Sequence, residues 1–359
     1  MSRPARAWLD PEALRHNLAK VRERAPGSHV MAIIKANAYG HGLTWAARTL
    51  GGVDAFGVAS IEEGCELRAA GIIHPVCLLE GFFAASEIPL LAREGLIPTI
   101  HEPGQVTAIA ATRVPLEVWL KLDSGMHRLG FPLEHGNAVF TRLLEMPGVS
   151  KIGVMSHLAS ADNPFDTATD VQIKAFLSVT ASWGIERSIA NSAGVLGWPE
   201  SHMEWVRPGL MLYGMSPLIG RQAIEFDLRP VMTLESAVIA VREHRKGMAI
   251  GYGGEYVCPE NMPVGVVAIG YGDGYPRHAP SGTPVLVGDT IVPLIGRVSM
   301  DMITVDLRRR PRTRVGERVV LWGRGLPAEE IARHAQTIPY TLVCGVTPRI
   351  PRQEIGDGH

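Results

Sequence analysis

From residue 30 to residue 42 the chain reads Val30-Met-Ala-Ile-Ile-Lys35-Ala-Asn-Ala-Tyr39-Gly-His-Gly42. Five consecutive apolar residues precede Lys35, and such a run is typical of a strand that is buried on both faces. Lysine is rarely buried, because an ammonium group loses its favourable hydration there. A lysine at the end of a buried strand therefore suggests chemistry, most simply an amine that forms a Schiff base. The alternative is a structural lysine whose ammonium extends past the strand end into water. This stretch alone is compatible with both.

Seven further apolar runs follow this one, and most of the intervals between them show the helical spacing of apolar residues. The eight expected strands are 30–36, 55–60, 75–80, 96–101, 116–123, 152–157, 188–192 and 209–213. Expected helices include 11–24, 61–70, 102–111 and 171–183, and Asp10 is placed to cap the first of them. This alternation predicts an α/β fold, a (β/α)8 barrel of the TIM type. An open, doubly wound sheet is the alternative, although no GxGxxG motif follows the first strand.

The pattern changes near residues 229–230. The runs beyond them are short, rich in Val and Ile, and separated by Gly, Pro and Asp, which is typical of an all-β region. We expect strands at 234–242, 264–271, 283–287, 290–295, 302–307 and 318–322, and one helix at 327–334. The sequence thus predicts two domains: a barrel in residues 1–228 that carries Lys35, and a mainly β domain in residues 229–359. The chain end, 355–359, is expected to fray.

Composition excludes several classes of protein. The chain has 359 residues, 46% of them hydrophobic and 20% charged, as expected for an ordinary globular protein. Its net charge of -1 offers no attraction for nucleic acid or for an anionic membrane. The four cysteines are widely spaced and form no CxxC motif, so we expect neither a disulfide framework nor a metal site. Neither a signal peptide nor a membrane span is visible, and we expect a cytoplasmic protein.

Polar side chains follow the expected carboxyl ends of several barrel strands. Each of them also has a structural interpretation: Asp123 can cap a turn, His157 can be a hydrogen-bonded core histidine, and Arg207 can form an ion pair. The carboxyl ends of the strands form the active-site face of a (β/α)8 barrel. So many polar residues at one rim therefore favour an active site built from Lys35, Asp123, Arg128, His157, Asn191, Ser192 and Arg207.

Ordered motifs along nearly the whole chain carry a resemblance to a known family. They are Lys35-Ala-Asn-Ala-Tyr-Gly-His-Gly42, Lys121-Leu-Asp-Ser-Gly-Met-His-Arg128-Leu-Gly130, Met155-Ser-His157, Asn191-Ser-Ala193, Val206-Arg-Pro-Gly-Leu-Met-Leu-Tyr-Gly214, Gly251-Tyr252-Gly253, Gly270-Tyr271-Gly-Asp-Gly274 and Gly296-Arg-Val-Ser-Met300-Asp301. In these motifs the chain resembles the bacterial alanine racemases, enzymes of fold type III that use pyridoxal 5'-phosphate (PLP). The resemblance implies a barrel followed by a β domain, PLP as cofactor, and interconversion of L-alanine and D-alanine.

Racemisation removes the α-proton of an amino acid and returns a proton from the opposite face. The α-carbon is a very weak acid, and PLP supplies the electron sink that its deprotonation needs. The resemblance implies that Lys35 is the base on one face and Tyr252 the base on the other. Because a phenol has an ordinary pKa of about 10, it also implies a proton chain from Tyr252 through His157 to Arg207. Without the family, Tyr252 would be interpreted as a turn aromatic between two glycines.

The resemblance also implies the binding roles of the remaining residues. Arg207 would face the pyridine nitrogen of PLP; since arginine can only donate hydrogen bonds, it would keep that nitrogen unprotonated and favour racemisation over transamination. Arg128, Met300 and Asp301 would contact the substrate, and Lys121, which is a carbamate in some relatives, would support Arg128. The cofactor contacts would be Lys35, Tyr39, His157, Asn191, Ser192, Arg207, Gly209, Leu210 and Tyr271.

The resemblance further implies a homodimer. Tyr252, Met300 and Asp301 belong to the second domain, whereas Lys35 belongs to the barrel. In this family the complete site forms between two subunits, so each site would take Tyr252 of the partner subunit. The enzyme would supply D-alanine for peptidoglycan or serve alanine breakdown.

Two segments depart from some members of the family. Residues 187–190 lack a histidine that supports the arginine under PLP in some relatives, and residues 344–350 lack a tyrosine found near the phosphate and substrate. Three alternatives stay open at this point: a broad-specificity amino acid racemase, a PLP-dependent decarboxylase, and a PLP-carrier protein without catalytic activity. A decarboxylase usually has an acidic residue where Arg207 stands, and a carrier would have the barrel alone.

Overall fold

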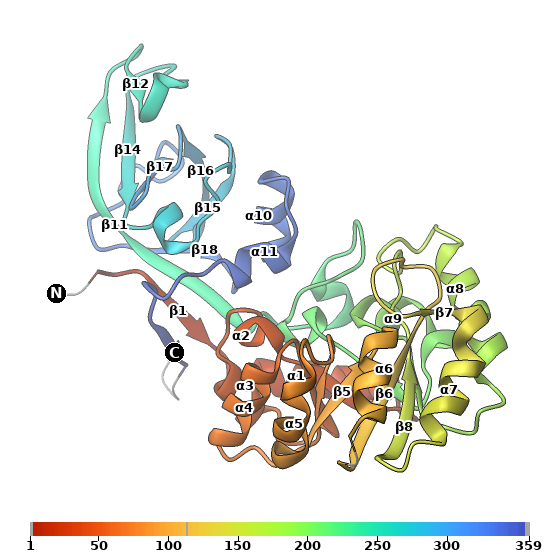
Figure 1. Ribbon diagram of the computed structural model, residues 1–359. Coiled ribbons are helices and arrows are strands. Elements are labelled where there is room, and N and C mark those ends of the chain that lie inside the picture. Colours follow the sequence, from red (N-terminus) through yellow and green to blue (C-terminus); the bar gives the residue numbers. More distant parts are fainter. Residues whose placement is uncertain (1–2, 113, 356–359) are drawn as a thin grey trace.

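The computed structural model describes residues 3–112 and 114–355 and contains two domains (Figure 1). One domain is a parallel barrel wrapped by helices, and the other is a mainly antiparallel β domain. The expected fraying of 355–359 falls almost entirely on residues outside this description. Ile355 is described, and its N–H donates to the carbonyl of Leu9 at 2.8 Å.

The barrel closes through parallel pairs in the order β5-β4-β3-β2-β10-β9-β8-β6, with β6 returning to β5. The short strand β7 (Phe131–Pro132) adds to β6 outside the closed ring. The expectation of a (β/α)8 barrel is therefore confirmed. The ring consists of β2 (His29–Ile33), β3 (Ala55–Val58), β4 (Val76–Leu78), β5 (Leu96–Ile100), β6 (Leu116–Asp123), β8 (Val149–Met155), β9 (Arg187–Ser188) and β10 (Trp205–Val206).

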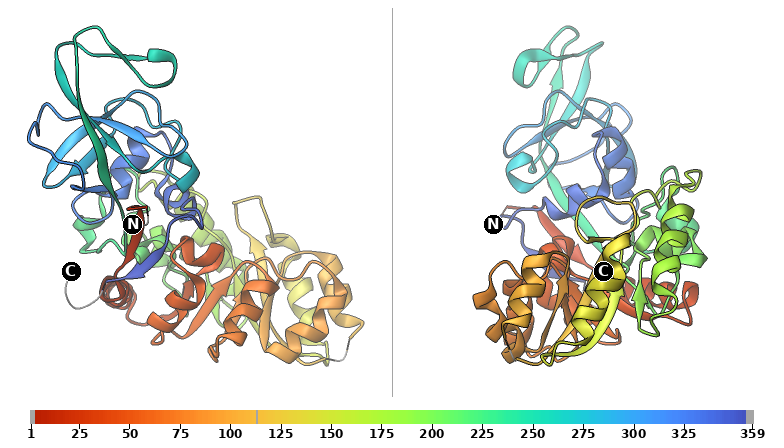
Figure 2. Two further views of the ribbon diagram at one scale, coloured as in Figure 1. Left: turned by 90° about the vertical axis from the view of Figure 1, so that its left-hand side faces the viewer. Right: turned by 45° about the vertical axis from the view of Figure 1, so that its right-hand side comes forward.

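Helices follow the strands and cover the outside of the barrel (Figures 1 and 2). The first begins at Pro11 because the carboxylate of Asp10 accepts the N–H of Ala13 at 2.9 Å and so caps it. The α-helices of this domain are α1 (Pro11–Arg24), α2 (Lys35–Tyr39), α3 (Leu43–Thr49), α4 (Ile61–Ala69), α5 (Ile88–Glu94), α6 (Pro103–Ala110), α7 (Gly136–Leu144), α8 (Ala168–Thr180) and α9 (Ser192–Gly197). Its 3-10 helices are η1 (Ala85–Glu87), η2 (Leu133–His135), η3 (Pro199–Ser201), η4 (Leu210–Tyr213) and η5 (Ala223–Phe226).

The sequence predicted an eighth barrel strand at 209–213, and this prediction is wrong. The ring is closed by β10 (Trp205–Val206), which pairs with both β9 and β2, while Leu210–Tyr213 form the 3-10 helix η4. All four residues of η4 are buried, so no alternation of apolar and polar residues distinguished a strand from a helix. The correction places Arg207 directly after a barrel strand, at the rim where a functional residue is expected.

The second domain is an eight-stranded sheet in the order β14-β17-β16-β15-β18-β11-β1-β19, with β14 also paired to β11. Two of its strands, β1 and β19, were not predicted; β1 pairs antiparallel with β11 and parallel with β19, so both ends of the chain join this sheet. The strands are β1 (Arg6–Leu9), β11 (Met232–His244), β14 (Met262–Val267), β15 (Pro284–Val287), β16 (Thr290–Ile295), β17 (Ile303–Asp306), β18 (Arg318–Trp322) and β19 (Arg352–Glu354). A separate hairpin is formed by β12 (Ala249–Ile250) and β13 (Tyr256–Val257), and the helices are α10 (Ala328–His334), α11 (Pro339–Cys344), η6 (Tyr252–Gly254) and η7 (Tyr271–Asp273).

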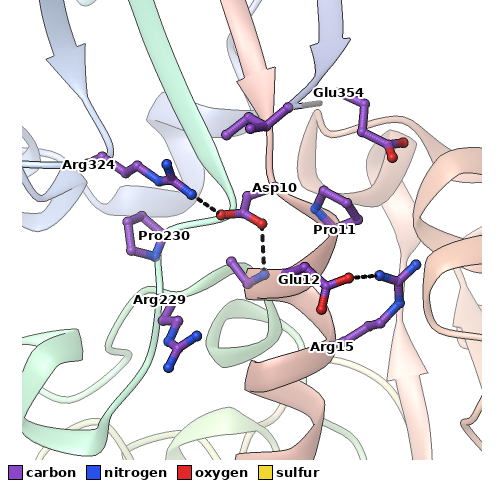
Figure 3. A pocket seen from close by; sticks show the side chains of 10 residues that line it. Asp10, Pro11, Glu12, Arg15, Arg229, Pro230, Arg324 and Glu354 are labelled. Atoms are coloured by element: carbon purple, nitrogen blue, oxygen red, sulfur yellow. Dashed lines mark hydrogen bonds and ion pairs between the residues drawn. The ribbon is translucent and has the colours of Figure 1, made fainter. Parts of the chain in front are cut away.

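Polar contacts join the domains where β1 runs into α1 and the chain enters β11. Figure 3 shows Asp10 between the N–H that it caps and the guanidinium of Arg324, which lies 2.5 Å from its Oδ2 atom. On the barrel side, the buried amide of Asn17 donates to the carbonyls of Leu212 and Arg229 at 2.9 and 2.8 Å. The backbone N–H of Arg229 donates to the side-chain oxygen of Asn17 at 2.8 Å. These contacts attach the segment between the domains to the first helix.

Candidate active site

With the exception of Asp123, the barrel residues expected at the site line one cavity. It has a volume of about 1260 Å³ and lies at the carboxyl ends of the barrel strands, with α10 and α11 of the second domain on its other wall. Asp123, by contrast, is a capping residue: one carboxylate oxygen accepts the backbone N–H groups of 125, 126 and 127 at 3.0 to 3.1 Å. The predicted residues that line the cavity are Lys35, Tyr39, Lys121, Arg128, His157, Asn191, Ser192, Arg207, Gly209 and Leu210.

Lys35 stands directly at the end of β2, where the backbone takes an unusual path. The four residues that follow, Ala36 to Tyr39, all have positive φ angles of 52° to 54°, so α2 is a left-handed turn. Residues with a Cβ avoid this conformation, at a cost of about 1–2 kcal/mol each. Consecutive strained residues persist only where surrounding contacts hold them, and such strain is typical of functional sites. The turn directs both Lys35 and Tyr39 to the cavity wall.

Side-chain acceptors hold this turn. The carboxylate of Glu63 accepts the N–H of Ala36 at 2.7 Å and that of Ala59 at 2.8 Å, so it joins the turn to the end of β3. The side chain of Asn37 accepts the N–H of Leu43 at 2.8 Å and so connects the turn to α3. No local sequence pattern predicts this role of Glu63, because the contact joins segments that follow two different strands of the barrel.

Arg207 is buried, with 3% of its surface exposed, and it lines one side of the cavity. One amino group donates to the hydroxyl of Ser188 at 2.6 Å, and the other donates to the carbonyl of Ser156 at 2.5 Å and lies 3.3 Å from Nδ1 of His157. Since arginine can only donate, Nδ1 of His157 accepts, and a neutral His157 carries its proton on Nε2. Ser188 therefore supports Arg207 in the segment 187–190, where some relatives have a histidine.

The buried cations of this cavity form no ion pair with a carboxylate of the described chain, although acidic side chains also line it: Glu80, Asp162, Glu329 and Glu330. Burial, followed by the charges of Arg207 and Lys121, holds the pKa of His157 well below its ordinary value. Burial and the neighbouring guanidinium groups of Arg207 and Arg128 lower the pKa of Lys121 to about 7. Burial also lowers the pKa of Arg207 to about 10. Such a site stabilises an anion and disfavours additional protons.

Gly209, Tyr39 and Ser192 form a cradle suited to a phosphate group. A Cβ built on Gly209 would lie 2.4 Å from the hydroxyl of Tyr39, so glycine permits the backbone and the phenol to approach closely. The hydroxyl oxygen of Ser192 accepts the N–H groups of Gly209 and Met211 at 2.8 and 3.2 Å, which leaves its own proton available to a ligand. Ser192 begins helix α9, whose N-terminal dipole favours an anion. The residues present thus fit PLP.

The second-domain residues expected at the site lie elsewhere in the single chain. Tyr252 follows β12 in the hairpin at the end of the β domain farthest from the barrel, and 66% of its surface is exposed (Figures 1 and 2). Met300 and Tyr271 are 52% and 38% exposed. Asp301 is engaged with Arg349, whose guanidinium lies 2.6 Å from its carboxylate. None of the four lines the barrel cavity.

The described ranges, 3–112 and 114–355, contain neither a candidate metal centre nor a helix that could cross a membrane. No cluster of three or more His, Cys, Asp or Glu side chains is placed to hold a metal ion within these ranges. Over the same residues, every helix is too short or too polar to cross a bilayer.

Comparison with known proteins places the chain among relatives of one kind. Residues 9–217 match the family model of the alanine racemase N-terminal domain, and residues 231–354 match that of the alanine racemase C-terminal domain. An alanine racemase of Nitrosococcus oceani is 52% identical over 349 residues, which cover 96% of this chain and 98% of that protein.

Solved structures agree with these matches. The crystal structure of the biosynthetic alanine racemase of Pseudomonas aeruginosa superposes with a TM-score of 0.96 at 44% identity, covering 99% of this chain and 100% of that one. The alanine racemase of Bacillus anthracis with bound L-Ala-P superposes with a TM-score of 0.86 at 28% identity, covering 100% and 97%. The cation-lined cavity at the barrel rim, both domain matches and these near-complete superpositions lead to one conclusion: the chain belongs to the alanine racemase family.

Proposed function

We propose that this protein interconverts L-alanine and D-alanine with PLP as cofactor and two bases on opposite faces of the substrate. The observation that carries the proposal is the cavity at the barrel rim. It places the amine of Lys35 beside a cradle for phosphate and a buried arginine, among further cations suited to a substrate carboxylate. A purified sample incubated with L-alanine or with D-alanine should carry either one to the same racemic mixture, followed by circular dichroism. A sample that leaves both enantiomers unchanged would refute the proposal.

The chain's own residues would hold PLP at both of its polar ends. The hydroxyls of Tyr39 and Ser192 and the backbone at Gly209 and Leu210 would bind the phosphate. Arg207 would face the pyridine nitrogen, and Asn191 and His157 line the same wall. When bound, PLP supplies the electron sink that makes the α-proton removable.

Two side chains would move the proton. The amine of Lys35 would remove or return a proton on one face, and the phenol of Tyr252 of the partner subunit would do so on the other. A neutral His157, with its proton on Nε2, could donate to that phenol's oxygen and hold it in position. Arg207 would fix the orientation of His157 through the contact at Nδ1.

Arg207 also bears on the choice of reaction. Its contacts to Ser156, Ser188 and His157 are all to neutral groups, so no carboxylate in these contacts offsets its charge. A permanently charged donor at the pyridine nitrogen would disfavour a proton there. Carbanion character would then be short-lived, which favours return of the proton to the α-carbon. This argues for racemisation over transamination, and against the decarboxylases that have an acidic residue at this position.

Lys121 would support Arg128 at the substrate carboxylate. Its lowered pKa of about 7 leaves much of the amine neutral near neutral pH. A neutral amine can react with carbon dioxide to form a carbamate, and the resulting anion would be stabilised by Arg128 and Arg207. Because Lys121 is 8% exposed and borders the cavity, the carbon dioxide can reach it from there. An intact-mass measurement under gentle conditions would detect the carbamate, and Lys121→Met should lack it.

Assembly as a homodimer would complete the site. Tyr252, Tyr271 and Met300 are exposed aromatic and apolar side chains on the β domain, away from the cavity of their own chain. A second copy could cover them and bring Tyr252 of the partner subunit to the rim of this barrel. Such an enzyme could supply D-alanine for peptidoglycan or feed alanine breakdown, since racemisation runs in both directions.

A further inference from the structure

Helix α11 of the second domain packs directly on the left-handed turn α2. A Cβ built on Gly40 would lie 2.1 Å from the carbonyl oxygen of Val343, so the two backbones are in contact there. Arg352 bridges the same two segments: its Nε atom donates to the carbonyl of Gly40 at 2.5 Å, and one amino group donates to that of Val346 at 2.9 Å. The second domain therefore borders the turn that carries Tyr39.

One aromatic ring of α11 lies beside the phosphate cradle. The centroid of the Tyr340 ring is 5.7 Å from that of Tyr39, and on the barrel side the ring of Tyr213 stacks on Tyr39 at 4.8 Å. Tyr213 is itself anchored, because its hydroxyl donates to the carbonyl of Ile33 at 3.1 Å and its ring stacks on His41 at 4.5 Å. Tyr39 thus has an anchored ring of the barrel and a ring of the second domain as neighbours.

The hydroxyl of Tyr39 is not held by a hydrogen bond. Tyr39 lines the cavity at the barrel rim, and its hydroxyl has no hydrogen-bond partner among the described residues. In the same part of the chain, the fully enclosed polar atoms without a partner belong to other side chains, so this oxygen is open to the cavity. Burial, followed by the nearby Tyr340 and Cys344, raises the pKa of Tyr39 well above its ordinary value. The phenol therefore keeps its proton and can donate it to a phosphate, while its position depends on the neighbouring rings.

We propose that Tyr340 is a positioning residue for the phosphate: its ring, carried by the second domain, confines the phenol of Tyr39 beside Gly209. This role rests on the proposed use of PLP. Without the ring of Tyr340, the side chain of Tyr39 would have room to leave its rotamer, and phosphate binding would have to order it again. The coupling is reciprocal, because a phosphate that holds Tyr39 in place also favours the docking of α11 on the barrel.

The test compares PLP with pyridoxal, which lacks only the phosphoryl group. Cofactor-free protein is titrated with each ligand, and the visible absorbance gives the ratio of the two affinities. Tyr340→Leu should reduce the preference for PLP by about 10- to 100-fold, the range for a hydrogen bond to a charged group, and leave the affinity for pyridoxal nearly unchanged. Tyr340→Phe keeps the ring and should keep the wild-type preference, as should Thr341→Ala at an exposed position of the same helix. Wild-type preference in Tyr340→Leu would overturn the proposal. A loss of preference in Tyr340→Phe would also overturn it, because the effect would then belong to the hydroxyl of Tyr340.

A second substitution separates positioning from general damage. In Tyr39→Phe the hydroxyl is absent, so adding Tyr340→Leu should cause no further loss of preference, and an equal loss in both backgrounds would show that Tyr340 does not act through Tyr39. If Tyr340→Leu does not fold, the wild-type protein decides. At equal occupancy, amide hydrogen exchange in α11 should be slower with PLP than with pyridoxal, and Tyr39→Phe should remove the difference. Equal exchange with both ligands would refute the coupling. A wild-type protein that binds neither ligand would instead refute the proposed use of PLP.

Discussion

At the scale of single residues, the cavity depends on two buried cations, Lys121 and Arg207, that form no ion pair with a carboxylate of the described residues. Arg207 is supported by two serines and a histidine, and Lys121 is desolvated beside two guanidinium groups. Removing charged groups from water costs free energy that neutral hydrogen bonds offset only in part. An anionic cofactor and an amino acid carboxylate would offset the rest, so the residues here are arranged for ligands at the expense of stability.

Arg207→Glu tests the proposed electronic role. A carboxylate at this position would favour a protonated pyridine nitrogen and prolong carbanion character. We expect racemisation to fall by at least about 100-fold, as for loss of a stabilising donor at a reacting group. Side transamination should appear, measured as pyruvate formed from alanine by a coupled dehydrogenase assay. The conservative variant Arg207→Lys should show the loss of rate without the pyruvate. If Arg207→Glu forms none, the electronic argument is wrong.

Lys121→Met should stabilise the cofactor-free protein, most strongly near neutral pH. The folded-state pKa of about 7 lies below the unfolded value of about 10.4, so between them the unfolded chain binds the proton that the folded chain lacks. The free energy of unfolding of the wild-type protein should therefore rise as the pH increases from 7 toward 10. Below pH 7, the full destabilisation caused by burying the Lys121 ammonium should remain. The variant should gain about 3–5 kcal/mol at pH 7 and about 1 kcal/mol at pH 9.5, measured by urea unfolding. The exposed control Lys174→Met should show no such dependence; an identical gain at both pH values would contradict the prediction.

At the scale of elements, the short turn α2 has a strained backbone and positions Lys35 at the cavity. Its left-handed residues cost free energy locally, and contacts from α4 and α3 hold them. Gly40 ends the turn with φ of 79°, and a Cβ there would lie 2.1 Å from the carbonyl of Val343. The turn therefore packs directly on α11 of the second domain. In this way one segment connects the Schiff-base lysine of the proposal to the domain junction.

Glu63→Ala should loosen this turn. The substitution leaves the N–H groups of Ala36 and Ala59 without their acceptor, a loss of about 1–3 kcal/mol. We expect lower stability by thermal melting and weaker PLP binding by titration of the visible absorbance. Glu66→Ala, on the exposed side of the same helix, should change neither. Wild-type affinity for PLP in Glu63→Ala would show that the turn holds its shape without this carboxylate.

At the scale of the whole molecule, the two proposed bases lie on different domains of the chain. The barrel carries Lys35, and the β domain carries Tyr252 in the hairpin at its far end (Figure 1). The proposed symmetric dimer would bring the two bases together, because an interface that is used twice would complete two sites.

Two inactive variants should then complement each other. Lys35→Ala and Tyr252→Phe each remove one base, and in a mixed dimer one site carries both changes while the other carries neither. With random pairing of equal amounts, about half of the dimers are mixed and each restores one site, so about a quarter of wild-type activity should return. Co-expression with two different affinity tags isolates the mixed dimer. A purified mixed dimer without activity would place both bases on one chain.

Much of this architecture could be predicted from the sequence, because apolar periodicity reports burial. Seven of the eight barrel strands, the capped first helix and the change to short β strands follow from local patterns. The polar residues at the strand ends could be assigned to one rim because all parallel strands of a barrel end there. Their interpretation as a PLP site rests on the resemblance of ordered motifs.

Other features were decided by the tertiary structure alone. The strand at Trp205–Val206 is too short to show a period, and β1 and β19 form only because distant segments meet in the sheet. The left-handed turn at Ala36 to Tyr39 is held by Glu63, and the support of Arg207 by Ser188 crosses between neighbouring strands. The cavity of about 360 Å³ that Tyr213 and Trp322 line exists only where the domains face each other. Local sequence determines which segments are buried, but contacts between residues far apart in the chain carry no local pattern, so only the folded chain shows them.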